Sequence, residues 1–303
     1  MSGSSQMSKY KPRYPIYIPS KGRYKIGYTA KCMLKYKVPF KLVIEKQEYK
    51  QYADLYGAEN ILVLPFADRG SVIPSRNWIK EHSISEGHKR HWQFDDNMRG
   101  FYRVYGGKRL PCDANIAISI SEDFADRYEN VGILGIEYLM FGRHKTKPFE
   151  TNIRVYSCSL INNDIPHKWR GRYNEDADLC LQILSTGYWT TVLLNAFMVE
   201  KITTMVCKGG NTAKLYKEDG RAKMARSLER LWPGVVKVNR RFKRPQHIVA
   251  DGWKKFDNPL IRRTDIDWEA LKENKYDMSL NAVNNVKSPL LKKLIQEHHV
   301  KKN

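Results

Sequence analysis

Two adjacent carboxylates, Asp95 and Asp96, directly follow a predicted strand over residues 90–94, and Asn97 comes next. Oxygen ligands suit Mg²⁺ or Mn²⁺, which in turn can bind a substrate diphosphate and neutralise its charge as it leaves. We therefore expect a divalent metal at Asp95, Asp96 and Asn97. The alternative is that one aspartate only caps the following turn, as aspartate often does.

A second acidic cluster runs from Asn174 through Glu175 and Asp176 to Asp178 and opens a predicted helix over residues 175–186. A hydroxyl group that acts as a nucleophile must lose its proton to a base, and a carboxylate beside the ligand-binding edge of a sheet could accept it. The helix dipole alone also favours acids at this position. Because both clusters occur in one chain, we predict that Glu175 and Asp176 are catalytic.

Glycine, serine or asparagine stands beside basic side chains in four short segments. Glycine lets backbone N–H groups approach a phosphate closely, and arginine adds a fork of donors. Each segment could also be an ordinary turn. The chain has no GxxxxGK[ST] or GxGxxG pattern, which argues against P-loop and dinucleotide-binding proteins. The four segments are Ser20-Lys21-Gly22-Arg23, Arg69-Gly70, Arg76-Asn77 and Lys208-Gly209-Gly210-Asn211.

The most basic part of the chain covers a predicted helix over residues 221–231 and the stretch 237–244 (KVNRRFKR). Basic side chains follow phosphates, and the interleaved Trp232 and Phe242 could stack on a displaced base. The alternative is a solvated basic surface. The density of charge favours phosphate contact, and we predict that DNA binds at Arg240, Arg241, Lys243 and Arg244.

Strands and helices alternate along the part of the chain that must position these residues. We expect strands over residues 14–19, 40–45, 60–65 and 90–94, and helices over 26–36, 47–56 and 75–85. This order predicts an α/β fold with a mostly parallel central sheet covered by helices. Ligands bind at the carboxyl ends of the strands in such sheets, where Ser20–Arg23, Glu45 and Asp95–Asn97 all lie.

The rest of the chain is divided by the same patterns. We expect helices over residues 114–128, 175–186 and 221–231, strands over 132–141, 154–161 and 189–199, and two tail helices that begin near Asp265 and at Ser288. The predicted domains are a disordered, tag-derived N-terminus (1–12), a main α/β domain (13–252) and a C-terminal helical extension (253–303).

Charge and composition narrow the class of protein. The 303 residues carry a formal net charge of +21, which favours a polyanionic partner such as nucleic acid. The five cysteines lack the spacing of a zinc site or redox pair, and we expect reduced thiols in a cytoplasmic protein. We expect no contact with a membrane, because there is neither a signal peptide nor an apolar run near the ~20 residues of a membrane helix.

Taken together and in order, six segments resemble the TET/JBP-associated glycosyltransferases of bacteriophages, between about Tyr14 and Phe256. That family is similar to GT-A glycosyltransferases and adds sugars to 5-hydroxymethylated pyrimidines in phage DNA. The resemblance implies a UDP-sugar donor, a divalent metal (Mn²⁺ or Mg²⁺) and a DNA acceptor, with 5-hydroxymethylcytosine favoured. The segments are YPIYIPSKGR, VPFKLVIEKQEY, RGSVIPSRNWI, RHWQFDDN, YNEDADLCLQIL and the stretch from GGN to DGRAKMA.

The resemblance also implies roles for individual residues. Asp95 and Asp96 match the DXD-like metal and donor position, and Asn97 in place of a final aspartate leaves open which carboxylate binds the metal. Asp176, beside Glu175, matches the base of an inverting enzyme. His247 becomes a candidate late metal or diphosphate ligand, although the sequence alone favours an ordinary surface histidine. The implied nucleotide-sugar site comprises Pro19, Ser20, Arg23, Glu45, Gly70, Arg76, Asn77, Asp95, Gly209, Gly210 and Asn211.

Three other functions share parts of this pattern. The first is a glycosyltransferase for a protein or polysaccharide, which would need no charge of +21. The second is a metal-dependent nuclease that uses the same carboxylates. The third is a DNA-binding module without catalysis. The sugar (glucose, galactose, N-acetylglucosamine or arabinose), the modified base and the oligomeric state stay open.

Overall fold

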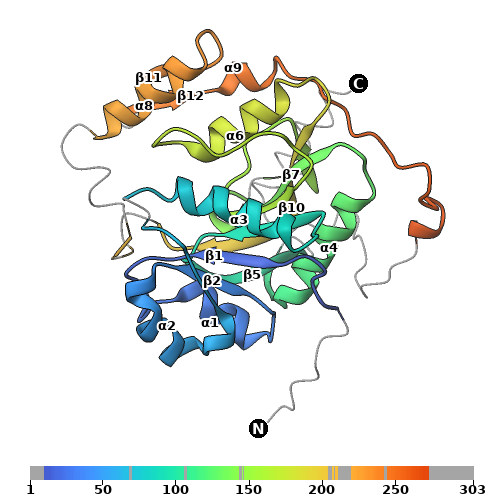
Figure 1. Ribbon diagram of the computed structural model, residues 1–303. Coiled ribbons are helices and arrows are strands. Elements are labelled where there is room, and N and C mark those ends of the chain that lie inside the picture. The colour runs from blue at the N-terminus through green and yellow to red at the C-terminus, as the bar shows by residue number, and fades with distance from the viewer. Residues whose placement is uncertain are drawn as a thin grey trace.

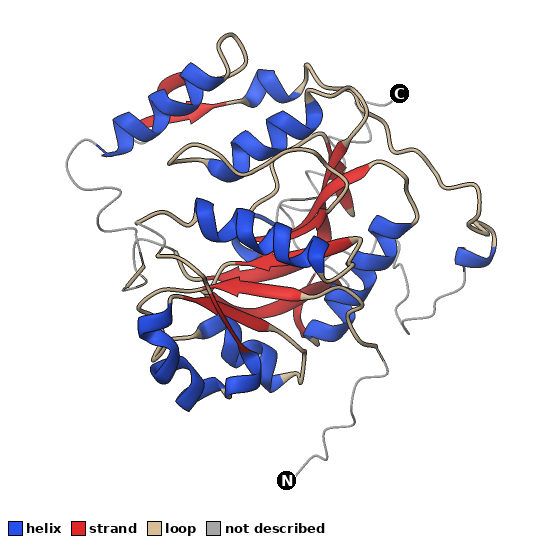
Figure 2. Cartoon of the chain, viewed as in Figure 1, coloured by secondary structure: helices blue, strands red, loops and turns tan. Residues whose placement is uncertain are grey.

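We describe the protein from a computed structural model (Figures 1 and 2). The structure describes residues 10–67, 70–105, 108–142, 145, 147–203, 207, 209–210, 220–241 and 244–272. The predictions for Asn211, Lys243 and a helix from Ser288 lie outside these residues. No helix in the described part of the chain combines the length and the apolar character needed to cross a membrane.

The described residues form one ten-stranded sheet with helices on both faces, and a two-stranded hairpin outside it. The sheet consists of β1 (Ile16–Pro19), β2 (Lys41–Ile44), β3 (Ile61–Val63), β4 (Arg90–Phe94), β5 (Met98–Tyr105), β6 (Lys108–Cys112), β7 (Val131–Tyr138), β8 (Phe149–Thr151), β9 (Cys158–Asn162) and β10 (Thr190–Lys201). The hairpin pairs β11 (Lys237–Arg241) with β12 (Arg244–Ile248) in antiparallel register.

Strand pairing fixes which strand ends meet. The order is β3-β2-β1-β4-β9-β7-β10-β5-β6, with β8 beside β10. Seven strands, β1 to β4, β6, β7 and β10, run in one direction, and β5, β8 and β9 run in the other. The predicted α/β fold with a mostly parallel sheet is confirmed. The carboxyl ends of β1, β2, β4, β7 and β10 therefore share one edge with the start of β9.

Helices cover the sheet as shown in Figure 1. The α-helices are α1 (Tyr28–Lys35), α2 (Tyr49–Tyr56), α3 (Ile73–Ser85), α4 (Ala114–Asp126), α5 (Leu139–Gly142), α6 (Glu175–Leu184), α8 (Gly220–Leu231) and α9 (Ala250–Trp253). The short 3₁₀ turns are η1 (Lys46–Glu48), η2 (Ala58–Asn60) and η3 (Ala270–Lys272).

Alternation along the strands divides the core between the two faces. In β1, Ile16 and Ile18 join α1, α2 and α4 in the main core, whereas Tyr17 between them packs toward α3. In β9, Leu160 belongs to the main core and Ile161 to the cluster under α6. Successive side chains of a strand point to opposite faces, so both faces need apolar residues. This is why β7 is a nearly continuous apolar run, whereas β4 also buries polar side chains such as His91 and Gln93.

A third layer lies outside α6. Ala177 and Leu181 on α6 are buried against Leu228 of α8 and against Val236 and Val249, which flank the hairpin. Figure 1 shows α8, β11 and β12 stacked above α6, on the side away from the sheet. The start of α6 is therefore enclosed between the sheet and this layer.

Several boundaries differ from the sequence prediction. The strand expected over 154–161 begins only at Cys158, because residues 152–157 include two left-handed residues, Asn152 and Ser157. The strand expected over 132–141 ends at Tyr138, where α5 begins. The prediction that a helix begins near Asp265 is wrong, because the described residues around it form turns and the next element is η3. The paired strands β5 and β6 and the hairpin β11–β12 were missed.

Candidate active site

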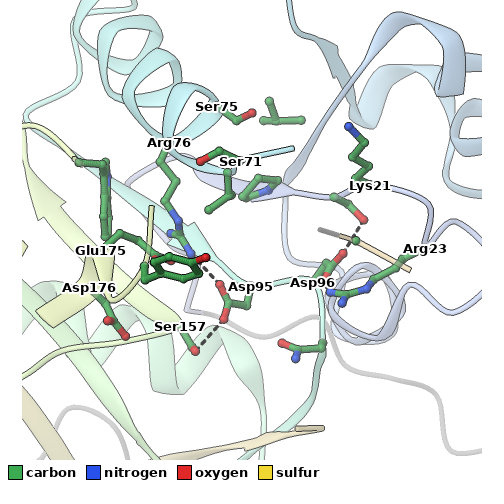
Figure 3. Close-up of a pocket in the computed structure, with 18 of the residues that line it drawn as sticks. Lys21, Arg23, Ser71, Ser75, Arg76, Asp95, Asp96, Ser157, Glu175 and Asp176 are labelled. Carbon is green, nitrogen blue, oxygen red and sulfur yellow. Dashed lines mark hydrogen bonds and ion pairs between the residues drawn. The ribbon is translucent and has the colours of Figure 1, made fainter. Parts of the chain in front are cut away.

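A cavity of about 320 Å³ opens at the shared carboxyl edge of the strands (Figure 3). The turn after β1, the ends of β2 and β4, and the starts of α3 and α6 contribute its walls. Eleven predicted site residues line it: Pro19, Ser20, Arg23, Glu45, Arg76, Asp95, Asp96, Asn97, Glu175, Asp176 and Gly210. Residues far apart in sequence meet here because parallel strands end at one edge.

Asp95, directly after β4, is held by three side chains. Its Oδ1 accepts a hydrogen bond from Arg76 Nη2 at 2.8 Å, and its Oδ2 accepts from Ser157 Oγ at 2.7 Å and from Lys201 Nζ at 2.6 Å. Burial alone would raise the pKa of this carboxyl, but the charges of Lys201 and Arg76 outweigh it and hold the pKa well below its usual range. Asp95 is therefore ionised at any physiological pH.

Asp96 points away from Asp95, toward the turn that follows β1. Its Oδ1 accepts from Arg23 Nη1 at 2.5 Å and its Oδ2 from Ser20 Oγ at 2.7 Å. Tyr52 of α2 holds the same serine at 2.7 Å. The two neighbouring aspartates therefore bind different cations on different sides of the strand end, as Figure 3 shows.

Asn97 completes the acidic segment. Its Nδ2 donates to the carbonyl of Ile202 at 2.7 Å, while its Oδ1 is buried and has no hydrogen-bond partner within the described chain. The amide thus ties the end of β4 to the end of β10, which carries Lys201.

The two acids at the start of α6 have different surroundings. Asp176 Oδ2 accepts from Arg154 Nη2 at 2.6 Å, and its Oδ1 accepts from the backbone N–H of Ala177 at 2.7 Å. No side chain in the described ranges donates a hydrogen bond to Glu175. Burial, and then the charge of Asp176, raise the pKa of the Glu175 carboxyl. Glu175 is therefore more readily protonated than an ordinary glutamate.

Sequence reasoning missed several cavity residues, above all Lys201, Ser157, Arg154 and Trp169. Lys201 is the last residue of β10, two positions beyond the predicted strand end, and a cation at that end was the available signal. Trp169 lies 4.7 Å from the Arg76 guanidinium and covers one side of it. Nothing local marks Ser157 and Arg154, whose place depends on the irregular segment before β9.

Some predicted residues do not line the cavity. Asn77 instead exchanges two hydrogen bonds with the backbone of Trp169, donating at 2.8 Å and accepting at 2.9 Å. The Gly209 carbonyl accepts from Arg23 Nη2 at 3.1 Å, and Gly70 lies outside the lining. His247, on β12, has a buried Nδ1 without a partner in the described chain. Burial, and then the charge of Arg154, lower its pKa to about 4.

The predicted metal ligands can be tested for fit. Hard divalent cations need several oxygen ligands around one point. Each carboxylate oxygen of Asp95 and Asp96 already accepts a hydrogen bond from an arginine, a lysine or a serine. No group of three or more His, Cys, Asp or Glu side chains suited to a metal occurs in the described residues. In this geometry the residues do not fit a metal ion, and metal dependence stays a prediction from the sequence.

Comparison with known protein families gives the class of this protein, a glycosyltransferase. Residues 14–210 match the TET-Associated Glycosyltransferase family, and the chain belongs to that family. Among curated proteins, none matches the chain. Among solved structures, it is similar to the mannose-1-phosphate geranyltransferase of Thermus thermophilus, with 11% identity, a TM-score of 0.28, and coverage of 81% of this chain and 68% of that one.

Proposed function

We propose that this glycosyltransferase moves a sugar from a UDP-sugar to the hydroxyl group of a 5-hydroxymethylated pyrimidine in phage DNA, with 5-hydroxymethylcytosine as the favoured base. One observation carries the proposal. One cavity is lined by several cationic side chains around the ends of β1, β4 and β10. It is also lined by a carboxylate at the start of α6, Glu175, to which no described side chain donates a hydrogen bond. A glycosyl donor needs the cations, and a hydroxyl acceptor needs the carboxylate.

The donor would occupy the side of the cavity formed by the turn after β1. Lys21 and Arg23 come from this turn, Arg76 from α3 and Lys201 from β10. Arginine offers paired donors that match phosphate oxygens, and lysine offers a compact charge. Glu45, which forms an ion pair with Lys21 at 3.1 Å, also lines this side of the cavity, as does Ser20. These two side chains would contact the nucleoside. Figure 3 shows Lys21 and Arg23 on the opposite side of Asp95 from Glu175 and Asp176.

Glu175 suits the role of base better than Asp176. A base works best when its pKa lies near the working pH, and the pKa of Glu175 is raised. Asp176, in contrast, forms an ion pair with Arg154. The acceptor oxygen would form a bond to the anomeric carbon while its proton passes to Glu175. The bond between that carbon and the β-phosphate oxygen breaks, and its electron pair leaves on UDP. A single displacement of this kind inverts the anomeric centre.

DNA would approach from the layer outside α6. Lys223, Arg226 and Arg230 are exposed and lie three or four residues apart on α8, so they share one face of the helix. Arg240 of β11 is also exposed. The Met224 carbonyl accepts a hydrogen bond from Asn174 Nδ2 at 2.8 Å, which ties this helix to the residue before Glu175. Phosphates bound along α8 would thus bring a flipped or groove-exposed base near the cavity.

A transfer assay tests this proposal. The protein is mixed with each of several UDP-sugars and with DNA that contains 5-hydroxymethylcytosine or 5-hydroxymethyluracil, and the DNA is then digested to nucleosides for mass spectrometry. Matched DNA with unmodified bases is the control. We expect a gain of one glycosyl group on a hydroxymethylated base only. Transfer to a protein or polysaccharide acceptor, with none to either DNA, would contradict the proposed acceptor. Cleavage of plain DNA would support a nuclease.

A further inference from the structure

Lys201 occupies a central place among the cations of the cavity. Its Nζ donates to Asp95 Oδ2 at 2.6 Å, to Ser157 Oγ at 2.6 Å and to the Tyr138 hydroxyl at 3.1 Å. Only 14% of the side chain is exposed. Three acceptors around one buried ammonium group fix its position. Lys201 is thus a preorganised positive charge at the cavity wall.

Arg76 holds a second charge on the other side of the same carboxylate. Its guanidinium donates to Asp95 Oδ1 at 2.8 Å and to Gln93 Oε1 at 3.2 Å, and the Trp169 ring covers it. Its Nε is buried without a partner in the described chain. Two fixed cations flank one aspartate, so this group keeps a net positive charge after Asp95 is counted.

A divalent metal at Asp95 would conflict with this arrangement. The metal would have to replace Lys201 or Arg76 as the partner of a carboxylate oxygen of Asp95. Both cations would then lie next to a doubly charged ion. Like charges at such distances repel strongly inside a protein, where screening by water is weak. Both cations, in contrast, have the sign that a diphosphate requires, and Arg76 also has unused N–H donors for it.

We propose that Lys201 and Arg76, held in place by Asp95, bind the diphosphate of the donor and stabilise the leaving nucleotide in place of a divalent metal. The inference rests on the proposed function and concerns the same site. As the bond from the anomeric carbon to the β-phosphate oxygen breaks, the electron pair stays on that oxygen. Arg76 stabilises the negative charge through the N–H groups that it does not use on Asp95 and Gln93. Lys201, whose three N–H groups already have acceptors, stabilises it through its positive charge. The proton of the acceptor still passes to Glu175.

Binding of UDP, measured by isothermal titration calorimetry in EDTA and again in Mn²⁺, tests this directly. We expect the wild-type protein to bind UDP in EDTA, with an affinity that Mn²⁺ changes less than about threefold. Lys201→Met should weaken UDP binding at least about tenfold in EDTA. Lys35→Met, on the exposed face of α1, removes an equal charge outside the cavity and should bind UDP as the wild type does.

The outcomes separate this inference from the proposed function. UDP binding that needs Mn²⁺ would overturn the inference and leave the function intact. Failure of UDP, and of every other nucleoside diphosphate tried, to bind with or without Mn²⁺ would overturn both. If Lys201→Met does not fold, electron paramagnetic resonance of Mn²⁺ with wild-type protein and UDP tests the inference instead. We expect no protein-bound Mn²⁺. A signal from bound Mn²⁺ would contradict the inference.

Discussion

At the scale of single residues, neighbours in the chain take different roles because they have different partners. Asp95 forms ion pairs with Lys201 and Arg76, whereas Asp96 forms one with Arg23. Glu175 and Asp176 differ in the same way, since of the two only Asp176 forms an ion pair with an arginine among the described residues. Burial and the neighbouring charge of Asp176 together raise the pKa of Glu175, so this carboxylate holds a proton more readily than an ordinary glutamate.

Glu175→Gln should therefore lower turnover by about 10²-fold or more, because general base catalysis contributes on the order of 10²–10⁴. In the wild type, turnover should fall as the pH drops through the pKa of Glu175, since only the ionised form accepts a proton. That acid limb should lie above the ordinary glutamate value of 4.5, because the pKa is raised. Turnover measured against pH tests both points. The role would pass to Asp176 if Asp176→Asn lost this activity and Glu175→Gln kept it.

At the scale of elements, the start of α3 fixes the loop that covers Arg76. Asn77 uses both ends of its amide on the backbone of Trp169, so helix and loop are joined at one point. Trp169 in turn lies over the guanidinium that binds Asp95. A residue predicted to contact the donor thus supports the wall of the cavity instead of lining it.

Asn77→Ala should loosen this wall without removing a group from the cavity. We expect a higher KM for the UDP-sugar, and a loss of about 1–2 kcal/mol in the free energy of unfolding from the two hydrogen bonds. Urea denaturation and donor titrations measure these effects. Ser85→Ala, at the exposed end of the same helix, is the matched control. A normal KM in Asn77→Ala would separate the Trp169 loop from donor binding.

The packing of β7 gives a second prediction at this scale. A Cβ on Gly135 would lie 2.5 Å from Val155 Cγ1 and 3.1 Å from the Cys158 carbonyl. Gly135→Ala should cost about 1–3 kcal/mol of stability through overpacking, measured by denaturant unfolding. Gly100→Ala, in β5, would meet only Tyr102 at 3.7 Å and should change stability much less. Equal losses in both variants would contradict this account of the β7–β9 contact.

Elements that a local sequence pattern specifies were predicted correctly. Features that depend on how distant strands pair were not. Apolar runs and helix patterns predicted β1 to β4 and the strand-end position of Asp95, because short-range alternation specifies these elements. The strands β5 and β6 carry many polar residues and offered no such pattern. Lys201 and Ser157 reach Asp95 only through the pairing of strands that are distant in the chain, which no local motif records.

At the scale of the whole molecule, the charge of +21 should act mainly through the layer outside α6. Reversal of Lys223, Arg226 and Arg230 to glutamate should weaken DNA binding and flatten its salt dependence. The slope of log affinity against log salt should fall by roughly 0.9 per lost phosphate contact. Fluorescence anisotropy across a salt series measures it. The same reversal at Lys31, Lys35 and Lys37, around α1, is the control, and equal effects in the two triples would move the DNA away from α8.

The most direct test of the central claim compares wild type and Glu175→Gln in the transfer assay on hydroxymethylated DNA. We predict that the wild type adds one glycosyl group per modified base, and that the variant does so at least about 10²-fold more slowly while it still binds UDP. Equal rates would remove Glu175 from the reaction. No transfer by the wild type from any UDP-sugar to either hydroxymethylated base would contradict the proposed reaction itself.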